Sequence, residues 1–173
     1  MSHVLDAICK RRSIRTYFGE TIPQDQLDAI LAAGLLSPTS QNRRPWQFYV
    51  TTDDATLAEL SHAKRAGAAF VANASAAIVV AIDGEDIDTW VEDESIALAY
   101  MHLVASDLGI GSCWVQMHLR STNDGTDAEE RVRQALGLNP RQRIVGLLAL
   151  GMPEQAPATH SIEDADFDRV HYR

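Results

Sequence analysis

The chain has 173 residues and a formal net charge of −9. This acidic balance argues against a general binder of nucleic acids or anionic membranes, because such proteins need a basic surface to displace counterions. A hydrophobic fraction of 46% in a chain of this length predicts one globular domain, residues 1–173, with a substantial core.

The two cysteines, Cys9 and Cys113, form no Cys-x-x-Cys pair and have no histidine at metal-ligand spacing. The sequence therefore predicts neither a disulfide scaffold nor a bound metal. The N-terminus lacks an uninterrupted apolar run, and no later segment approaches the length of a membrane span. We expect a soluble, cytoplasmic protein without membrane or nucleic-acid partners.

Hydrophobic periodicity and turn residues predict the elements in chain order. The expected helices span residues 4–10, 57–70, 92–108 and 128–136, and the expected strands span 46–51, 76–82, 113–115 and 143–150. Another helix opens at Pro23 and ends at Ser37-Pro38. Gly109 ends the helix expected at residues 92–108. Two helices followed by strands interleaved with helices indicate a sheet flanked by helices, of the α+β or α/β class.

Two regions near the C-terminus differ in character. The run from Ile144 to Leu150 is almost wholly apolar, which predicts a strand buried on both faces. The tail after Met152 carries prolines and acidic residues and has little core-forming character. We expect this tail to wrap over something larger than itself.

Three arginines, Arg11, Arg12 and Arg15, fall within five residues directly after the first expected helix. One interpretation is a solvated cluster at a helix C-terminus, where cations are favoured by the helix dipole. The other is a binding site for an anion. The arginine stretch alone leaves both interpretations open.

A second unusual stretch, Pro38 to Asn42, consists of hydroxyl and amide side chains between two prolines and is followed by Trp46. Such a loop either connects a helix to a strand or turns several donors and acceptors toward a ligand. The two interpretations cannot be separated on this stretch alone.

Common catalytic signatures do not occur. The stretch from Gly109 to Trp114 follows an expected helix and opens an expected strand, the reverse of a dinucleotide-binding loop. There is no Walker A sequence, no Gly-x-Ser-x-Gly elbow and no His-Glu-x-x-His pair. The six histidines are scattered, and we expect each to be a surface or hydrogen-bonded core residue. If the protein is an enzyme, its reactive group is therefore expected to come from a cofactor.

Together these stretches resemble a known family. Arg-Arg-Ser-Ile-Arg at 11–15, followed by Ser-Pro-Thr-Ser-x-Asn-x-x-Pro-Trp at 37–46, looks like the N-terminal signature of the FMN-dependent nitroreductase family. Leu-Gly-Ile-Gly-Ser-Cys-Trp at 108–114 and Val-Gly-Leu-Leu-Ala-Leu-Gly-Met-Pro at 145–153 are similar to that family as well. The resemblance implies an α+β fold with a central, mostly antiparallel sheet flanked by helices. It also implies an intertwined homodimer with composite sites, in which the tail wraps the partner subunit.

The resemblance further implies an FMN site. Arg11 and Ser13 match residues that hold the phosphate and ribityl chain, with Arg12 alongside, and Arg15 matches a basic residue beside the flavin N1 and C2 carbonyl. The loop that the other subunit lays over the isoalloxazine matches Pro38, Thr39, Ser40 and Asn42, and the backbone near the ring and its N5 edge matches Trp114, Val115 and Gln116.

The implied activity is hydride transfer from NAD(P)H to the flavin and then to a nitroaromatic, quinone or related acceptor, by a ping-pong mechanism. Flavin N5 carries this chemistry, so no catalytic side chain is expected, and Arg15 tunes the flavin electrostatically. Two alternatives stay open: a family branch with other flavin chemistry, such as dehalogenation or flavin breakdown, and a flavin-binding module. The physiological acceptor and the choice between NADH and NADPH are not determined by the sequence.

The sequence departs from the family pattern in places. Arg44 stands where glutamine is usual, and Thr39 replaces a common serine. Arg44 is either a contact for an anionic substrate or for the NADPH phosphate, or a solvated surface residue. The basic pair that would complete phosphate binding after the last strand has no good match, since only Arg169, His171 and Arg173 are available there.

Overall fold

The computed structural model describes residues 2–84, 86–155 and 157–173. Six strands in this part of the chain form one sheet, and every pairing between them is antiparallel. The strands are β1 (Tyr17–Phe18), β2 (Trp46–Thr51), β3 (Ala76–Asp83), β4 (Gly111–Gln116), β5 (Gln142–Arg143) and β6 (Gly146–Pro153). The order is β1–β6–β3–β2, with β4 also beside β6 and β5 beside β3. The expected α+β class with an antiparallel sheet is confirmed.

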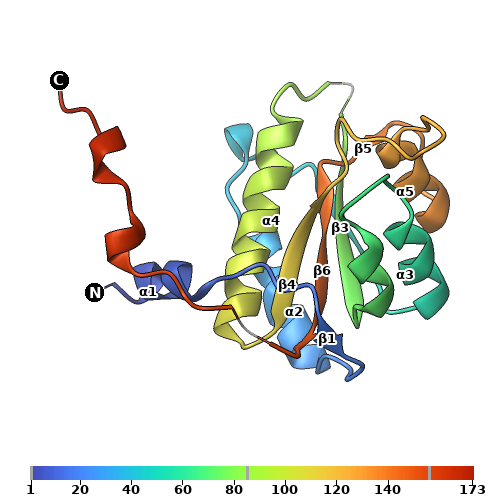
Figure 1. Ribbon diagram of the computed structural model, residues 1–173. Helices are drawn as coiled ribbons and strands as arrows, with labels where there is room; N and C mark the ends of the chain where they lie inside the picture. The colour runs from blue at the N-terminus through green and yellow to red at the C-terminus, as the bar shows by residue number, and fades with distance from the viewer. Residues whose placement is uncertain (1, 85, 156) are drawn as a thin grey trace.

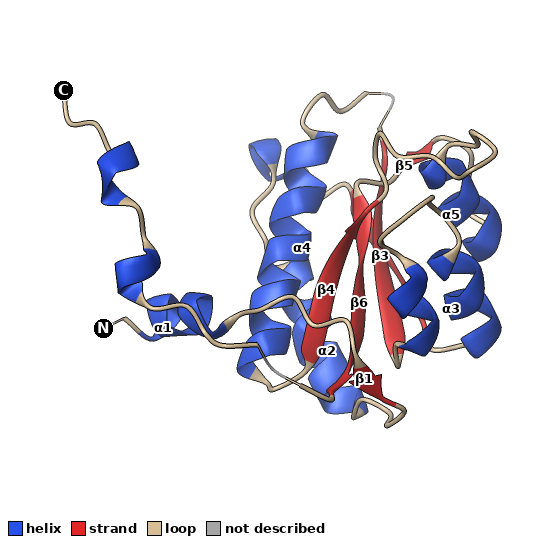
Figure 2. Ribbon diagram, in the orientation of Figure 1, coloured by secondary structure: helices blue, strands red, loops and turns tan. Residues whose placement is uncertain are grey.

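Helices cover both faces of this sheet (Figures 1 and 2). The α-helices are α1 (His3–Lys10), α2 (Gln24–Leu35), α3 (Asp54–Ser61), α4 (Trp90–Asp107) and α5 (Ala128–Leu136). Leucines and alanines of α2 and α4 pack on one face, and those of α3 and α5 pack on the other. Short 3₁₀ turns lie at Ser40–Asn42, Ala69–Asn73, Ile162–Asp164 and Phe167–Arg169.

The two central strands explain the apolar runs in the sequence. Ile78 in β3 and Leu148 in β6 face α2 and α4, whereas Val79 and Leu147 face α3 and α5. All four side chains are fully buried, since neither face of these strands meets water. Burying a side chain of this size contributes about 1.5–3 kcal/mol, so the alternating faces of two strands supply much of the core.

The helix expected at residues 57–70 is wrong. Helix α3 ends at Ser61, and the chain passes through turns before the 3₁₀ turn at Ala69–Asn73. Gly67 has a left-handed φ of 75°, which a continuing helix does not allow. Apolar side chains of this irregular segment, including Ala63 and Ala68, are buried in the core, so its sequence resembles the buried face of a helix.

The single strand expected at residues 143–150 is also wrong, because the structure divides it into β5 and β6. Between them, Ile144 donates its backbone N–H to Glu129 and Val145 donates to Glu94, at 3.0 and 2.7 Å. Two carboxyl groups thus replace strand partners at the break. Strand β4 is longer than the expected 113–115, and the two-residue strand β1 was not expected.

Both ends of the chain leave the body of the molecule (Figure 1). Helix α1 buries none of its described residues, and its Val4 and Ile8 side chains are 62% and 49% exposed. The tail runs beside α1, where the backbone N–H of His160 donates to the carbonyl of Cys9 at 2.9 Å. Among the described residues, no helix is both long and apolar enough to cross a membrane.

Candidate functional site

The arginine segment leaves α1 and runs beside strand β4. Ser13 forms a parallel bridge with Ser112, and the backbone N–H of Ile14 donates to the carbonyl of Ser112 at 2.9 Å. The other edge of β4 pairs with β6 along its whole length. The segment from Arg11 to Arg15 is therefore fixed at the start of a strand edge and is more than a helix end.

Beyond Ser112, no described strand covers this edge of β4. Because backbone direction alternates along a strand and the Ser112 carbonyl points outward, the backbone groups of Trp114 and Gln116 also point outward. Those of Val115 point toward β6, and its side chain is buried in the core. Trp114 and Gln116 thus offer an open row of donors and acceptors, whereas Val115 contributes packing.

The side chains on this edge are ordered among themselves. The indole Nε1 of Trp114 donates to Gln116 Oε1 at 3.1 Å, and Gln116 Nε2 donates to the carbonyl of His118 at 3.3 Å. The Trp114 side chain packs against the core cluster that α4 contributes to. The edge is consequently preorganised and does not need to assemble when a ligand binds.

Arg11 contacts a residue that local sequence patterns did not single out. His102, in α4, is 6% exposed, and its Nε2 lies 2.9 Å from Arg11 Nη1 while its Nδ1 lies 2.6 Å from Ser112 Oγ. Burial and the neighbouring charge of Arg11 lower the pKa of His102 to about 4. The histidine is therefore neutral at physiological pH. No short-range motif marks it, because Arg11 comes from a distant segment and Ser112 lies in the next strand, ten residues along the chain.

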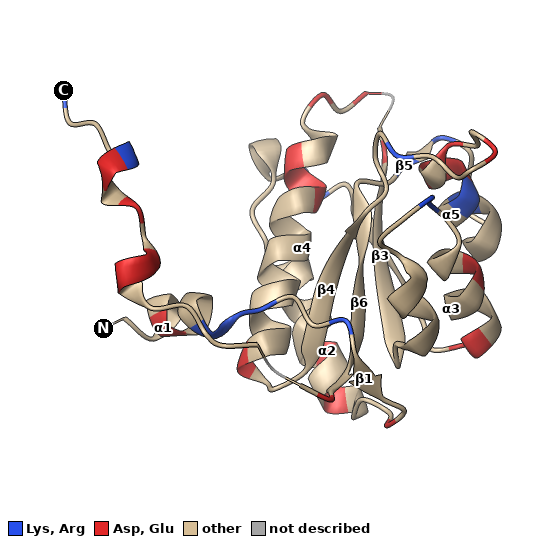
Figure 3. Cartoon of the chain, viewed as in Figure 1, with Lys and Arg blue, Asp and Glu red and all other residues tan. Residues whose placement is uncertain are grey.

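Arg12 and Arg15 lie in different surroundings. Arg12 donates from Nη1 to the carbonyl of Ala158 in the tail at 2.5 Å. Arg15 is exposed, and its guanidinium carbon lies 5.9 Å from the centre of the Phe70 ring. Figure 3 shows that basic residues follow the chain from α1 toward β1, whereas the tail beside α1 is mainly acidic.

A further cation, Lys64, belongs to this neighbourhood and was missed from the sequence. It is partly buried, and burial together with the charges of Arg120 and Arg15 lowers its pKa. Lys64 lies in the irregular segment after α3, where a regular helix had been expected. Its proximity to Arg15 depends on the fold, because 48 residues separate the two in the chain.

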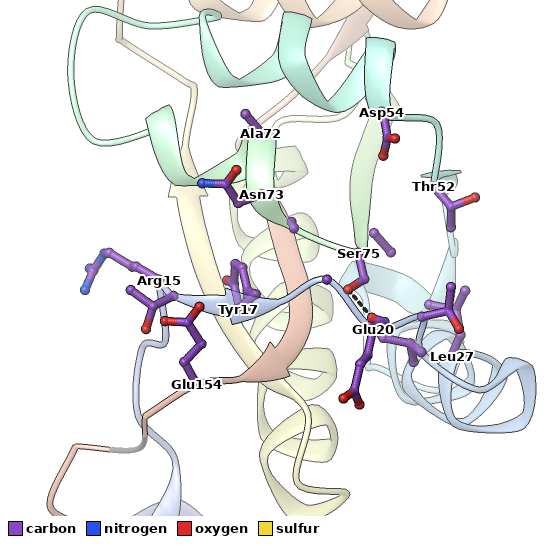
Figure 4. Close-up of a pocket in the computed structure, with 16 residues that line it drawn as sticks. Arg15, Tyr17, Glu20, Leu27, Thr52, Asp54, Ala72, Asn73, Ser75 and Glu154 are labelled. Carbon is purple, nitrogen blue, oxygen red and sulfur yellow. Dashed lines mark hydrogen bonds between the residues drawn. The ribbon is translucent and has the colours of Figure 1, made fainter.

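The large pocket shown in Figure 4, about 1080 Å³, lies elsewhere. Arg15 is its one lining residue from the predicted site, and Glu20, Asp54 and Glu154 make the remainder largely acidic. A hydrogen bond of 2.6 Å from Ser75 Oγ to the carbonyl of Glu20 closes one side. Size alone does not identify the site, since this pocket misses β4 and Arg11.

The loop of Pro38, Thr39, Ser40 and Asn42 is held in an unusual conformation. The backbone N–H of Ser40 donates to Asp93 Oδ1 at 2.9 Å, and Asp93 is 2% exposed. Thr39 Oγ1 accepts from the backbone N–H of Arg44, and Arg44 Nε donates to Asn42 Oδ1, both at 3.0 Å. The φ values of Asn42 and Arg44 are 54° and 50°. Non-glycine residues in this region are strained, a feature common at functional sites.

Within a single chain, this loop lies far from the arginine segment. The loop leads into Trp46, which pairs with Ile82 at one end of β3. Ser112 instead pairs with Leu150, which pairs with Ala76 at the other end of β3. Six steps along a strand correspond to about 20 Å. Measured along the strands, the loop and the arginine segment therefore lie at opposite ends of the sheet, whereas Trp114 to Gln116 lie between these two levels.

Two buried carboxyl groups lie near the end of β4. Burial alone would raise the pKa of Glu129, but hydrogen bonds from Arg143, His118 and Ile144 lower it. Burial raises the pKa of Glu94 well above its usual range, and its Oε1 has no hydrogen-bond partner among the described residues. Glu129 is thus ionised near neutral pH, whereas burial disfavours the charged form of Glu94. Their hydrogen bonds to the backbone make them part of the scaffold.

The last three basic residues, Arg169, His171 and Arg173, are exposed in the tail. Arg169 Nε donates to Asp166 Oδ2 at 2.7 Å. In the part of the chain that the structure describes, no group of three or more His, Cys, Asp or Glu side chains is arranged to hold a metal ion.

Comparisons with known proteins agree with this architecture. The model of the Nitroreductase family matches residues 8–81 and 60–152. A relative from Archaeoglobus fulgidus, provisionally named an NADH dehydrogenase/NAD(P)H nitroreductase, is 34% identical over 176 residues, which cover 99% of this chain and 98% of the relative.

Solved structures extend the comparison. An FMN-dependent nitroreductase from Clostridium difficile R20291 has a TM-score of 0.93 and 36% identity, covering 97% of this chain and 98% of its own. A nitroreductase with bound FMN from Bacteroides fragilis NCTC 9343 has a TM-score of 0.77 and 25% identity, covering 100% of both chains.

The protein is of the nitroreductase-like α+β class. Its antiparallel sheet lies between two helical layers, and a basic segment follows an open strand edge. The chain belongs to the Nitroreductase family.

Proposed function

We propose that this protein is an FMN-dependent oxidoreductase that takes hydride from NAD(P)H and passes it to a nitroaromatic, quinone or related acceptor. Family membership and the FMN-dependent nitroreductase from Clostridium difficile support this proposal. The observation that carries it is the bridge between Ser13 and Ser112, which aligns the arginine segment with the open edge of β4.

The residues present fit the chemistry of FMN. Arg11 retains guanidinium N–H groups beyond the one facing His102, and a guanidinium binds phosphate with charge-assisted hydrogen bonds. The Ser13 hydroxyl suits the ribityl chain. The outward backbone groups of Trp114 and Gln116 suit the polar edge of a planar ring. Phosphate and ring would therefore lie along β4 in that order.

FMN supplies the hydride chemistry when it is bound. The protein's contribution is to orient the ring and to place charge beside it. Arg15, with Lys64 nearby, would stabilise the negative charge that accompanies reduction, because a preorganised cation costs no reorganisation during the reaction. One face of the ring must stay open, so that NAD(P)H and the acceptor use it in turn.

The proposal includes an intertwined homodimer with two composite sites. The strained loop of Pro38–Asn42 leads into β2, which β6 and β3 separate from β4, so the loop would serve the site of a second copy. The exposed apolar side chains of α1, with Phe167 at 65% and Tyr172 at 93% exposure in the tail, offer surface for that copy. Arg12 and the tail would meet the partner together.

The decisive experiment is titration of the purified protein with FMN, followed by anaerobic addition of NADPH or NADH. FMN fluorescence should be quenched at one flavin per chain, and the flavin absorbance should then bleach rapidly. Protein that leaves FMN fluorescence unchanged contradicts the proposal. Binding without bleaching would instead identify a flavin-binding module, and bleaching without turnover of nitroaromatics or quinones would favour other flavin chemistry.

A further inference from the structure

His102 is a buried polar side chain that links the proposed phosphate site to the sheet. It projects from the C-terminal half of α4, contacts Arg11 with one ring nitrogen and contacts Ser112 with the other. Ser112 is also the residue that bridges to Ser13. Three segments of the chain therefore meet at one imidazole.

The donors and acceptors of this contact define one tautomer. A guanidinium has only N–H donors, so His102 Nε2 must accept from Arg11. The proton of the neutral ring then resides on Nδ1, which donates to Ser112 Oγ at 2.6 Å. Protonation of Nε2 would break the contact and place two cations together.

A neutral partner has a specific advantage for an anion-binding arginine. An aspartate or glutamate would hold the guanidinium equally well, but its negative charge would compete with the ligand. Among the described residues, no acidic side chain forms an ion pair with Arg11, although ion pairs are formed by Arg131, Arg133 and Arg143. His102 thus fixes Arg11 while leaving its positive charge uncompensated.

We propose that His102 is a positioning residue, whose Nε2 acceptor orients Arg11 toward the phosphate of FMN. This inference rests on the proposed function, since it assumes that Arg11 binds the phosphate. It assigns His102 no contact with the flavin ring and no proton transfer.

Two variants separate the two contacts of the imidazole. His102→Gln places an amide oxygen near the position of Nε2 and keeps an acceptor for Arg11. His102→Asn places an amide N–H near the position of Nδ1 and keeps the donor to Ser112, but loses the acceptor. Each is titrated with FMN and with riboflavin, which lacks the phosphate, and His62→Asn at an exposed histidine is the control.

For His102→Asn, the FMN dissociation constant should rise about 10- to 100-fold, the range for loss of a hydrogen bond to a charged group. Riboflavin binding should stay close to wild type, which also shows that the variant is folded. His102→Gln should bind FMN nearly as the wild type does. Equal loss of FMN and riboflavin in the folded Asn variant, or unchanged FMN binding, overturns the positioning role.

Arg11→Ala separates failure of the proposed function from failure of the positioning role of His102. If the wild type binds no FMN, the proposed function fails. If Arg11→Ala loses FMN selectively and His102→Asn does not, the positioning role alone fails. A measurement on the wild type needs no variant: ¹⁵N NMR of labelled histidine should show His102 neutral with its proton on Nδ1, and a proton on Nε2 would overturn the inference.

Discussion

The backbone N–H of Ile14 donates to the carbonyl oxygen of Ser112 across 2.9 Å. This bond joins the segment after α1 to the first residues of β4 and leaves the rest of the β4 edge open. Because the direction of the backbone N–H and C=O groups alternates along a strand, this bond also determines that the backbone groups of Trp114 and Gln116 point outward. The geometry of the candidate site follows from this one contact.

Replacing Arg15 with alanine tests whether this exposed arginine acts on the flavin. Flavin reduction potential should fall, and reduction by NAD(P)H should slow by roughly 10- to 1000-fold, the scale for removing a preorganised charge contact. Stopped-flow absorbance and a potentiometric titration measure the two effects. Arg131→Ala, which removes an exposed arginine on α5, is the control. If Arg15 only packs on Phe70, stability should fall and the potential should not change.

A mixed dimer tests the composite site. Arg15→Ala and Asn42→Ala should each impair activity, although these residues lie at opposite ends of the sheet in one chain. If the loop serves the partner's site, a heterodimer of the two variants carries both defects in one site and none in the other. Differently tagged subunits allow that heterodimer to be purified and assayed. About half of wild-type activity is expected, and activity no higher than that of the parents would exclude the cross-subunit loop.

Steady-state kinetics test the single open face of the flavin. NAD(P)H and the acceptor should follow a ping-pong scheme, because each must leave before the other can bind. Initial-rate plots for varied NAD(P)H at several fixed acceptor concentrations should give parallel lines. Intersecting lines would show that both substrates bind at once.

Asp93→Ala tests how the strained loop is held. The variant leaves the backbone N–H of Ser40 without its carboxylate partner, so hydrogen exchange at Ser40 should accelerate. The free energy of unfolding should fall by about 1.5–3 kcal/mol, the range for loss of a hydrogen bond to a charged group. Glu92→Ala removes an exposed acidic residue from the same first turn of α4 and controls for the helix dipole. Equal effects of the two substitutions would mean that Asp93 acts only on the helix.

His102 predicts an acid-sensitive stability in the flavin-free protein. Its pKa is lowered from 6.5 to about 4, so the unfolded chain binds the proton first. The contribution of His102 to the free energy of unfolding is therefore fully present above pH 6.5 and is lost as the pH falls toward 4. This loss amounts to at most about 3 kcal/mol. Urea unfolding across this range measures the loss, and His102→Gln should lose less. Parallel pH profiles for wild type and variant would contradict the assignment.

Several elements follow from local sequence alone. The apolar run of β6 predicts burial on both faces because no polar side chain interrupts it, and the structure confirms this from Gly146 to Leu150. The helix expected at 92–108 corresponds to α4, whose end at Gly109 has the left-handed φ of 76° that glycine permits. The arginine segment and the polar loop also stand out by composition.

Other features depend on contacts between distant segments, which local periodicity does not contain. Helix α3 ends at Ser61 although buried residues continue at helical spacing, and β5 separates from β6 because the carboxyl groups of Glu129 and Glu94 bond the intervening backbone. In the same way, His102 is a scattered histidine in the sequence. It gains a defined tautomer and a partner only when α4 brings it between Arg11 and Ser112. The sequence by itself singled out the arginine segment and the polar loop as candidates, but not His102 or Lys64. The tertiary structure decided which of them meet, because hydrogen-bond direction and strand register are set by pairing partners far away in the chain.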